Sequence, residues 1–375
     1  MNGLEFLGLW GYALIPPQRL SGQGQLDAKA PPSGAAGGAP AAVALDLSNP
    51  KLTQFELCNC TGATLLVLDG GELGANGVEL GIYLPECETL TELKVNGKRV
   101  VSVAATGCNR LTKLDCTDTS IRHLPDYALF EVPSLSEVLL PTTLRRVGHF
   151  AFAGCSKLEV LAMPPLVERI GHLAFSGTSI RDMVLPRTLR KLGPGAFYDC
   201  VKLVLIDMSA TALYTLEESL CCESPSLATV KLPATLRSIR QFAFKSCTSL
   251  MDFSWGDIPG LERLGNYAFQ GSGLSSVELP AALKTIGARV FAGCERLERA
   301  DLGKCVGLEW TRLVKSSRSD ISQGAFADCD RLSEVVLPPG LGTTVHLRAP
   351  GLRGFHFIRS GESGDVFRAP DPPPP

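Results

Sequence analysis

The chain has 375 residues, of which 45% are apolar and 20% are charged, and its formal net charge is −2. The apolar share is large enough to form a sizeable core, which excludes wholesale disorder. The near-zero charge gives no chain-wide reason to expect nucleic acid or a membrane surface as a partner. No apolar run reaches the roughly 18–20 residues that a membrane-spanning helix needs.

The first residues lack the features of a conventional secretory signal. Residues 1–17 carry Glu5 and have neither a cationic start nor a clear small-residue cleavage site. Residues 18–42 are rich in Ala, Gly, Pro and Ser, which is typical of a flexible linker. We therefore predict an N-terminal extension, a linker and a cytoplasmic location. The alternative is a cell-surface or secreted protein whose signal is missing or unconventional.

From residue 90 onward, a short apolar phrase recurs at a nearly constant spacing. Its first Leu or Ile stands at positions 90, 111, 135, 158, 180, 203, 227, 250, 274, 297 and 332, so every step but the last lies between 21 and 24 residues. Such a unit cannot bury its apolar face alone, and its neighbours must stack on it, strand beside strand, about 4.8 Å apart. The sequence therefore predicts a solenoid over 43–338, with regular repeats in 90–338 and irregular capping repeats in 43–89.

A second phrase lies out of phase with the first. An Ala-Phe pair starts at positions 151, 174, 196, 243, 268 and 325, and just before it stands Leu-x-x-(Ile/Leu/Val), usually followed by Gly. The whole unit reads L-x-x-V-x-L-P-x-x-L-x-x-I-G-x-x-A-F-x-x-C. We expect Pro to end the strand, because it cannot donate to a ladder. Gly would permit the following turn, and Ala-Phe would supply a small residue and a large wedge to the core.

This unit resembles the BspA-type leucine-rich repeat, and the resemblance covers about residues 90–338. It implies an α/β solenoid, a leucine-rich repeat horseshoe with a concave parallel β-sheet and irregular or short helical turns on the other side. Members of the family are non-enzymatic recognition proteins, and many resemble adhesins or surface antigens of bacteria and parasitic protists.

The end of the chain departs from the repeat. The last step, of 35 residues, contains an insertion at 303–320 that includes Trp310 and Arg312. Insertions in solenoids form loops, often on a binding face. After Pro338 the periodicity fades, so residues 339–375 are predicted to be a C-terminal tail with a Pro-rich end.

Thirteen cysteines make thiol chemistry the first candidate to weigh. Seven share one phase, three residues before a repeat Leu: Cys87, Cys108, Cys155, Cys200, Cys247, Cys294 and Cys329. The odd total and the missing signal favour a ladder of buried, reduced thiols over disulfides. Cys58, Cys60 and the Cys221-Cys222 pair lack the ligand spacing and the nearby His of a zinc site, so we expect no metal.

No catalytic motif is present. His149 and His172 share a repeat phase and should stack, which is a geometry for a shared proton or metal, although an exposed ladder position filled twice by His is the favoured interpretation. The chain has no G-x-S-x-G elbow, and its Gly-rich run at 34–38 lacks the Lys and the strand of a phosphate loop. We therefore expect neither an enzyme nor a cofactor.

Charged residues segregate between the two phrases. The third and fifth residues of the strand phrase should point outward, and they include seven acids: Glu137, Asp182, Asp207, Asp252, Glu278, Asp301 and Glu334. Positions around the Leu-x-x-Ile-Gly phrase are rich in bases: Arg145, Arg146, Arg169, Arg190, Lys191, Arg237, Arg240, Arg263 and Lys284. In one interpretation, both rows are solvated faces of the protein, and the aliphatic parts of the Arg side chains cover apolar surface. Alternatively, the acidic concave sheet receives a basic protein segment.

We predict a monomeric, non-enzymatic scaffold that recognises a protein, not nucleic acid. The seven acids would form its binding face, and Trp310 and Arg312 of the insertion would add to it. The alternative function is an extracellular adhesin or surface antigen.

Overall fold

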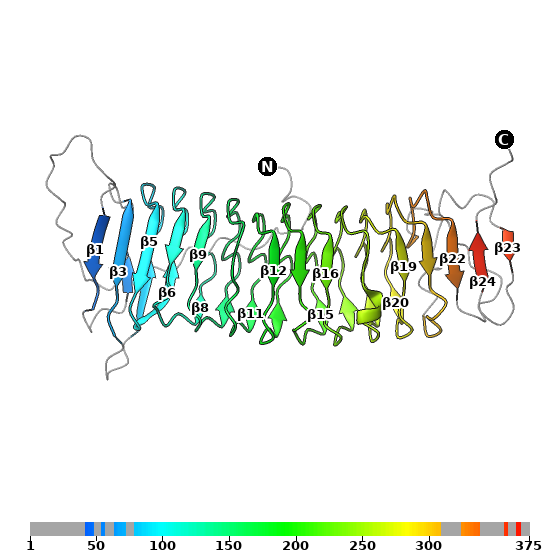
Figure 1. The fold of residues 1–375 in the computed structure, drawn as a ribbon, viewed down its shortest axis with the longest axis horizontal. Helices are drawn as coiled ribbons and strands as arrows, with labels where there is room; N and C mark the ends of the chain where they lie inside the picture. The colour runs from blue at the N-terminus through cyan, green and yellow to red at the C-terminus, as the bar shows by residue number, and fades with distance from the viewer. Residues whose placement is uncertain are drawn as a thin grey trace. The chain divides into compact units, whose positions relative to one another are not determined.

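The computed structural model describes residues 42–48, 54–56, 64–72, 79–308, 324–337, 356–358 and 365–368, all within one compact unit spanning 39–375. In these residues successive coils stack side by side, and short strands line two sides of the stack (Figure 1). The sheet formed by the strand phrase is named the first sheet here, and the sheet formed by the Leu-x-x-Ile-Gly phrase is the second sheet.

The first sheet consists of parallel strands in chain order, hydrogen-bonded in three groups. The groups are β1 (Ala42–Asp46), β3 (Leu65–Asp69), β5 (Glu92–Asn96), β7 (Lys113–Asp115) and β9 (Glu137–Leu139); β12 (Asp182–Val184), β14 (Leu205–Asp207) and β16 (Thr229–Lys231); and β19 (Ser276–Glu278), β21 (Arg299–Asp301) and β22 (Glu334–Leu337). The interruptions fall at the repeats that begin with Leu158 and Leu250. Strands β1 and β3 continue the sheet into the segment predicted to cap it.

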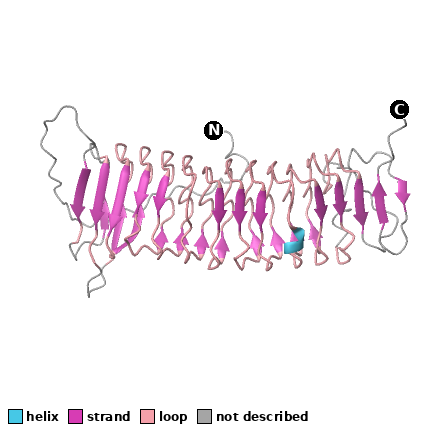
Figure 2. Ribbon diagram, in the orientation of Figure 1, coloured by secondary structure: helices cyan, strands magenta, loops and turns pink. Residues whose placement is uncertain are grey.

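The second sheet is also parallel, and most of its strands have only two residues. Its groups are β2 (Gln54–Glu56), β4 (Leu80–Tyr83) and β6 (Val100–Ala104); β8 (His123–Leu124), β10 (Arg146–Val147), β11 (Arg169–Ile170) and β13 (Lys191–Leu192); and β15 (Thr215–Leu216), β17 (Ser238–Ile239), β18 (Arg263–Leu264) and β20 (Thr285–Ile286). The described residues contain one helical turn, η2 (Trp255–Asp257), drawn in cyan in Figure 2. The predicted parallel-strand solenoid is confirmed, with strands and turns in place of helical turns opposite the first sheet.

Two further strands extend the first sheet beyond the regular repeats. Strand β24 (Asp365–Arg368) pairs antiparallel with β22, and β23 (His356–Ile358) pairs antiparallel with β24. Both lie in the segment that the sequence predicts only as a tail. By pairing with β22, β24 occupies the edge that the last parallel strand would otherwise leave open.

The Ala-Phe loops join neighbouring coils through a third set of backbone hydrogen bonds. The N–H groups of Phe150, Phe152 and Gly154 donate to the carbonyls of His172, Ala174 and Ser176, at 2.9, 2.8 and 2.9 Å. The same pattern recurs at later junctions. Buried backbone groups of these loops therefore find their partners in the next coil, as a buried main chain requires.

These loops place Phe on Phe in the core. Phe152, Phe175 and Phe197 are fully buried, and their ring centroids lie 5.3 and 5.4 Å apart in near-parallel stacks. Trp255, which replaces the usual Leu at the end of its repeat, is also buried and lies 5.4 Å from the ring of Phe269. Trp255 is therefore a core residue.

The glycines that follow the second-sheet strands lie where coils approach most closely. A Cβ on Gly171 would come within 2.6 Å of the carbonyl carbon of Gly148, and a Cβ on Gly193 within 2.5 Å of that of Gly171. None of the three has a positive φ. Their role is therefore close approach of backbones, not the conformational freedom of a turn that the sequence suggests.

We predict that Gly171→Ala lowers the free energy of unfolding by about 1–3 kcal/mol, because the added methyl overpacks a backbone contact that is repeated on both sides. Gly307→Ala is the matched control, since no atom lies within 4 Å of its added Cβ. Guanidinium unfolding of both variants measures the difference. Equal unfolding midpoints would contradict the prediction, because they would show that the neighbouring coils accommodate the added methyl at Gly171 without loss of stability.

Candidate functional site

The seven acids predicted from the sequence lie on the outer side of the first sheet. Its strands alternate exposed and buried residues, with Val138 of β9 and Met183 of β12 facing the core between outward neighbours. Four acids are exposed and three are half-buried: Glu137, Asp182, Asp252 and Glu278, then Asp207, Asp301 and Glu334. The predicted outward orientation is therefore found at every one of these positions.

Five of the seven acids form ion pairs with described bases. The pairs are Glu137–Lys113 at 2.8 Å, Asp207–Lys231 at 3.1 Å, Glu278–Lys304 at 2.5 Å, Asp301–Arg299 at 3.1 Å and Glu334–Arg299 at 2.6 Å. Exposed pairs of this kind contribute roughly 0–1 kcal/mol to stability. Their main consequence is for charge, because they neutralise much of the row that the sequence presents as acidic.

Two of the paired acids also close the turn after their strands. Asp207 Oδ1 accepts hydrogen bonds from the backbone N–H and the hydroxyl of Ser209, at 3.0 and 2.6 Å. Asp301 Oδ1 accepts one from the N–H of Gly303 at 2.9 Å. Burial acts to raise the pKa of Asp207, but Ser209 and Lys231 outweigh it and lower the pKa. These two carboxylates have a structural role of the Asx-turn type.

Asp182 and Asp252 form no ion pair with any described residue. Asp182 is exposed at the start of β12, and three exposed apolar side chains lie on this coil and the two before it: Leu139 is 38% exposed, Val160 76% and Val184 62%. Leu139, Val160 and Val184 are named the apolar patch here. The structure thus sets an unpaired carboxylate among exposed apolar groups near the middle of the first sheet.

The apolar patch was not predicted, although its signal is present in the repeat. Most outward third and fifth positions from Leu135 onward are polar; five are Leu or Val, and the patch consists of the three of these that are exposed. The other predicted site residues, Trp310 and Arg312, lie outside the described residues, as do Cys58 and Cys60.

The cysteine ladder is confirmed as a row of buried thiols. All eleven described cysteines are buried. The Sγ of Cys155 donates to the carbonyl of Leu129 at 3.2 Å, and that of Cys200 to the carbonyl of Phe175 at 3.1 Å. In one coil Ser224 occupies the position of the ladder cysteine, and its hydroxyl donates the equivalent hydrogen bond to the carbonyl of Phe197 at 3.1 Å. The thiols therefore satisfy carbonyls of the preceding coil.

Burial raises the pKa of Cys155 and of Cys200 to about 12. We predict that both thiols resist iodoacetamide in the native protein at about pH 8 and react once the chain is unfolded, because the thiolate is the nucleophile. Alkylation followed by peptide mass spectrometry measures this. Rapid native labelling of Cys155 would contradict the buried donor role. Cys200→Ser, which copies Ser224, should retain more stability than Cys200→Val, which has no donor.

His149 and His172 stack as expected, and their rings bind backbone groups. His149 Nδ1 accepts the N–H of His172 at 2.8 Å, and His172 Nδ1 lies 2.9 Å from the carbonyl of Pro194. Burial lowers the pKa of His172. Among the described residues, no group of three or more His, Cys, Asp or Glu side chains is placed to hold a metal. That part of the chain also contains no helix long and apolar enough to cross a membrane.

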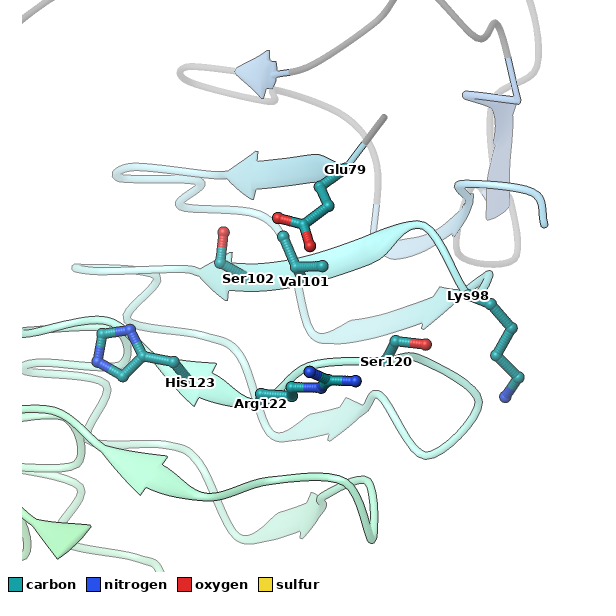
Figure 3. Close-up of a pocket in the computed structure, with 7 residues that line it drawn as sticks. All are labelled: Glu79, Lys98, Val101, Ser102, Ser120, Arg122 and His123. Carbon is teal, nitrogen blue, oxygen red and sulfur yellow. The ribbon is translucent and has the colours of Figure 1, made fainter. Parts of the chain in front are cut away.

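A hollow of about 410 Å³ opens on the second sheet between β6 and β8, which are not hydrogen-bonded to each other. Its lining residues, shown in Figure 3, are Glu79, Lys98, Val101, Ser102, Ser120, Arg122 and His123. His123 Nε2 is buried without a hydrogen-bond partner among the described atoms. Burial, and then the Arg146 charge, lower the pKa of His123. The sequence pattern does not predict this hollow, because it results from a break in sheet pairing.

A family model described as the BspA type leucine rich repeat region matches six copies over residues 86–204 and 214–341. The chain belongs to this family. The family is generally a non-enzymatic binding fold, so membership supports the predicted recognition role at that level. Membership gives no support to the predicted cytoplasmic location. A search of curated protein sequences returned no match.

The fold agrees with that of one solved structure, and two others are similar to the chain over a comparable length. A leucine-rich repeat protein from Bacteroides ovatus is 21% identical, with a TM-score of 0.51, over 72% of this chain and 59% of that one. A leucine rich cell surface protein from Faecalibacterium prausnitzii is 19% identical, with a TM-score of 0.39, over 75% and 76%. The pneumococcal vaccine antigen PcpA is 18% identical, with a TM-score of 0.36, over 68% and 73%. This chain thus spans less than two thirds of the Bacteroides structure, and at such identities the first of these likenesses shows the fold alone.

Proposed function

We propose that this solenoid is a protein-recognition module whose first sheet binds a basic protein segment at Asp182 and the apolar patch. The observation that carries the proposal is the exposure of Val160 and Val184, 76% and 62%, next to a carboxylate with no ion pair among the described residues. Protein interfaces have an apolar centre and a polar rim, and a few central residues supply most of the affinity. In this proposal, the ion-paired acids on neighbouring coils form the polar rim of the interface.

The charge of Asp182 indicates the chemistry of the segment. Its carboxylate is free to accept an incoming Lys or Arg, whereas Asp207 and Glu334 are already paired. A segment that covers the apolar patch would exclude water from around Asp182. The loss of water would strengthen the attraction of Asp182 to a cation, and also its repulsion of an acidic partner. Of the seven acids predicted to bind the partner, we therefore retain Asp182 as the main contact. Asp252 is a second contact three coils further on, roughly 14 Å away.

The alternative role is an extracellular adhesin or surface antigen of this repeat type. It would use the same face of the first sheet, and the two roles differ in where the partner is found. A cytosolic partner supports the scaffold, and a partner displayed on intact cells supports the adhesin. Trp310 and Arg312 remain predicted contacts in either role.

A displayed library of random peptides tests the recognition proposal directly. We expect the selected peptides to share a Lys or Arg flanked by apolar residues. Asp182→Lys and Val184→Asp should each weaken their binding by about tenfold or more, because the first reverses the charge that meets the cation and the second removes an apolar contact at the centre of the interface.

Glu295→Lys is the matched control for Asp182→Lys. It makes the same charge change at an exposed turn residue that forms no ion pair with described residues. Binding by this variant should stay within about twofold of the wild type. Selected peptides that bind the Asp182→Lys protein unchanged would overturn the proposed site, and acid-rich selected peptides would overturn its chemistry.

A further inference from the structure

The second sheet aligns three like charges on adjacent strands. Arg146 lies in register with Arg169, and Arg169 with Lys191, on three adjacent strands. All three side chains are exposed, and none forms an ion pair with a described residue. Adjacent strands are about 4.8 Å apart, and like charges directly opposite each other are destabilising. On the first sheet, by contrast, Lys113 lies opposite Glu137.

The row widens into a track two residues across. Arg122 and Arg190 are exposed beside it without an ion pair in the described part of the chain, whereas Arg145 is paired with Glu168. The basic track is defined here as Arg122, Arg146, Arg169, Arg190 and Lys191. Five cations on, or directly before, four neighbouring strands therefore have no ion pair with a described residue.

Both ends of the basic track are visible in the structure. At one end Arg122 lines the hollow between β6 and β8, where the hydroxyls of Ser102 and Ser120 supply further hydrogen-bonding groups (Figure 3). At the other end the next strand, β15, carries Thr215 in the outward position and is followed by Glu217 and Glu218. The track is therefore short, and it begins in a concavity.

The strands of the track favour a ligand recognised mainly by charge. Strands β8, β10, β11 and β13 carry no exposed large apolar side chain and no Phe, Tyr or Trp. The aromatic rings of Tyr127, Phe130 and Phe150 lie on the loops that follow β8 and β10, where they are half-buried and packed against one another. Protein partners need apolar or aromatic anchors, and single-stranded nucleic acids need aromatic platforms for their bases. A long duplex following the track would run on over Glu217 and Glu218. Arg guanidinium groups bind sulfate and carboxylate oxygens through paired hydrogen bonds, with no such anchor.

We propose that the second sheet binds a sulfated or carboxylated polysaccharide along the basic track, with one sugar seated in the hollow beside Arg122. Acidic groups on successive sugars would relieve the repulsion between Arg146, Arg169 and Lys191. The proposal concerns a different sheet from the peptide site at Asp182, so either can fail without the other.

Heparin is the probe for the full-length protein. We expect saturable binding that weakens steeply with salt, because the contacts are ionic. The double variant Arg146→Glu with Arg169→Glu should lose about tenfold or more in affinity. The control, Arg263→Glu with Arg296→Glu, makes the same charge change at exposed bases outside the track and should stay within about twofold. Thermal unfolding of both variants verifies that the fold is retained.

Three results would overturn the proposal. The first is a wild-type protein that does not bind heparin, and the second is an equal loss in the two double variants. The third is tighter binding of a DNA duplex or of polyglutamate than of heparin at matched salt, which would assign the track to another class of polyanion. Arg122→Glu tests the hollow separately. This variant should lower the affinity for heparin and leave peptide binding at Asp182 unchanged.

Discussion

Every coil of this protein depends on the next one to satisfy its main chain. The strands of both sheets form their backbone hydrogen bonds between coils. The Ala-Phe loops combine bonds to the next coil, such as that from Phe152 to Ala174, with turn bonds inside the coil, such as that from Cys155 to Phe152. A buried N–H or C=O without a partner costs about as much as a lost hydrogen bond. Coils must therefore stack in register, and each position of the repeat meets the same position of its neighbour.

This self-contact explains residues that no single coil explains. Phe rings stack on Phe rings, and thiols reach the carbonyls of the coil before. The residue before each Ala-Phe pair shows the same constraint: Phe150, Leu173 and Tyr267 have φ values of 54°, 50° and 57°. A left-handed backbone costs roughly 1–2 kcal/mol for a side chain of this kind. The hydrogen bonds between neighbouring loops offset that cost, so non-glycine residues are tolerated there.

Charge obeys the same register and has opposite results on the two sheets. On the first sheet, several acids are paired with a base of a neighbouring coil, whereas Asp182 has no ion pair with a described residue and lies near exposed apolar side chains. On the second sheet, Arg146, Arg169 and Lys191 lie in register on three adjacent strands, so like charges stand next to each other. The two sides of one solenoid therefore have different recognition chemistry, one suited to a protein segment and one to a polyanion.

The sequence by itself determined the repeat length, the inward Leu and Val set, the thiol ladder and the outward acids, because each depends only on phase within a 23-residue period. Tertiary structure alone decided the rest. Strands of two residues carry too little local signal to be distinguished from turns, so the second sheet appeared only when coils paired. Whether an acid is neutralised depends on which side chain the next coil places beside it, as Lys113 does for Glu137. The hollow at Arg122 likewise exists because two neighbouring strands fail to pair.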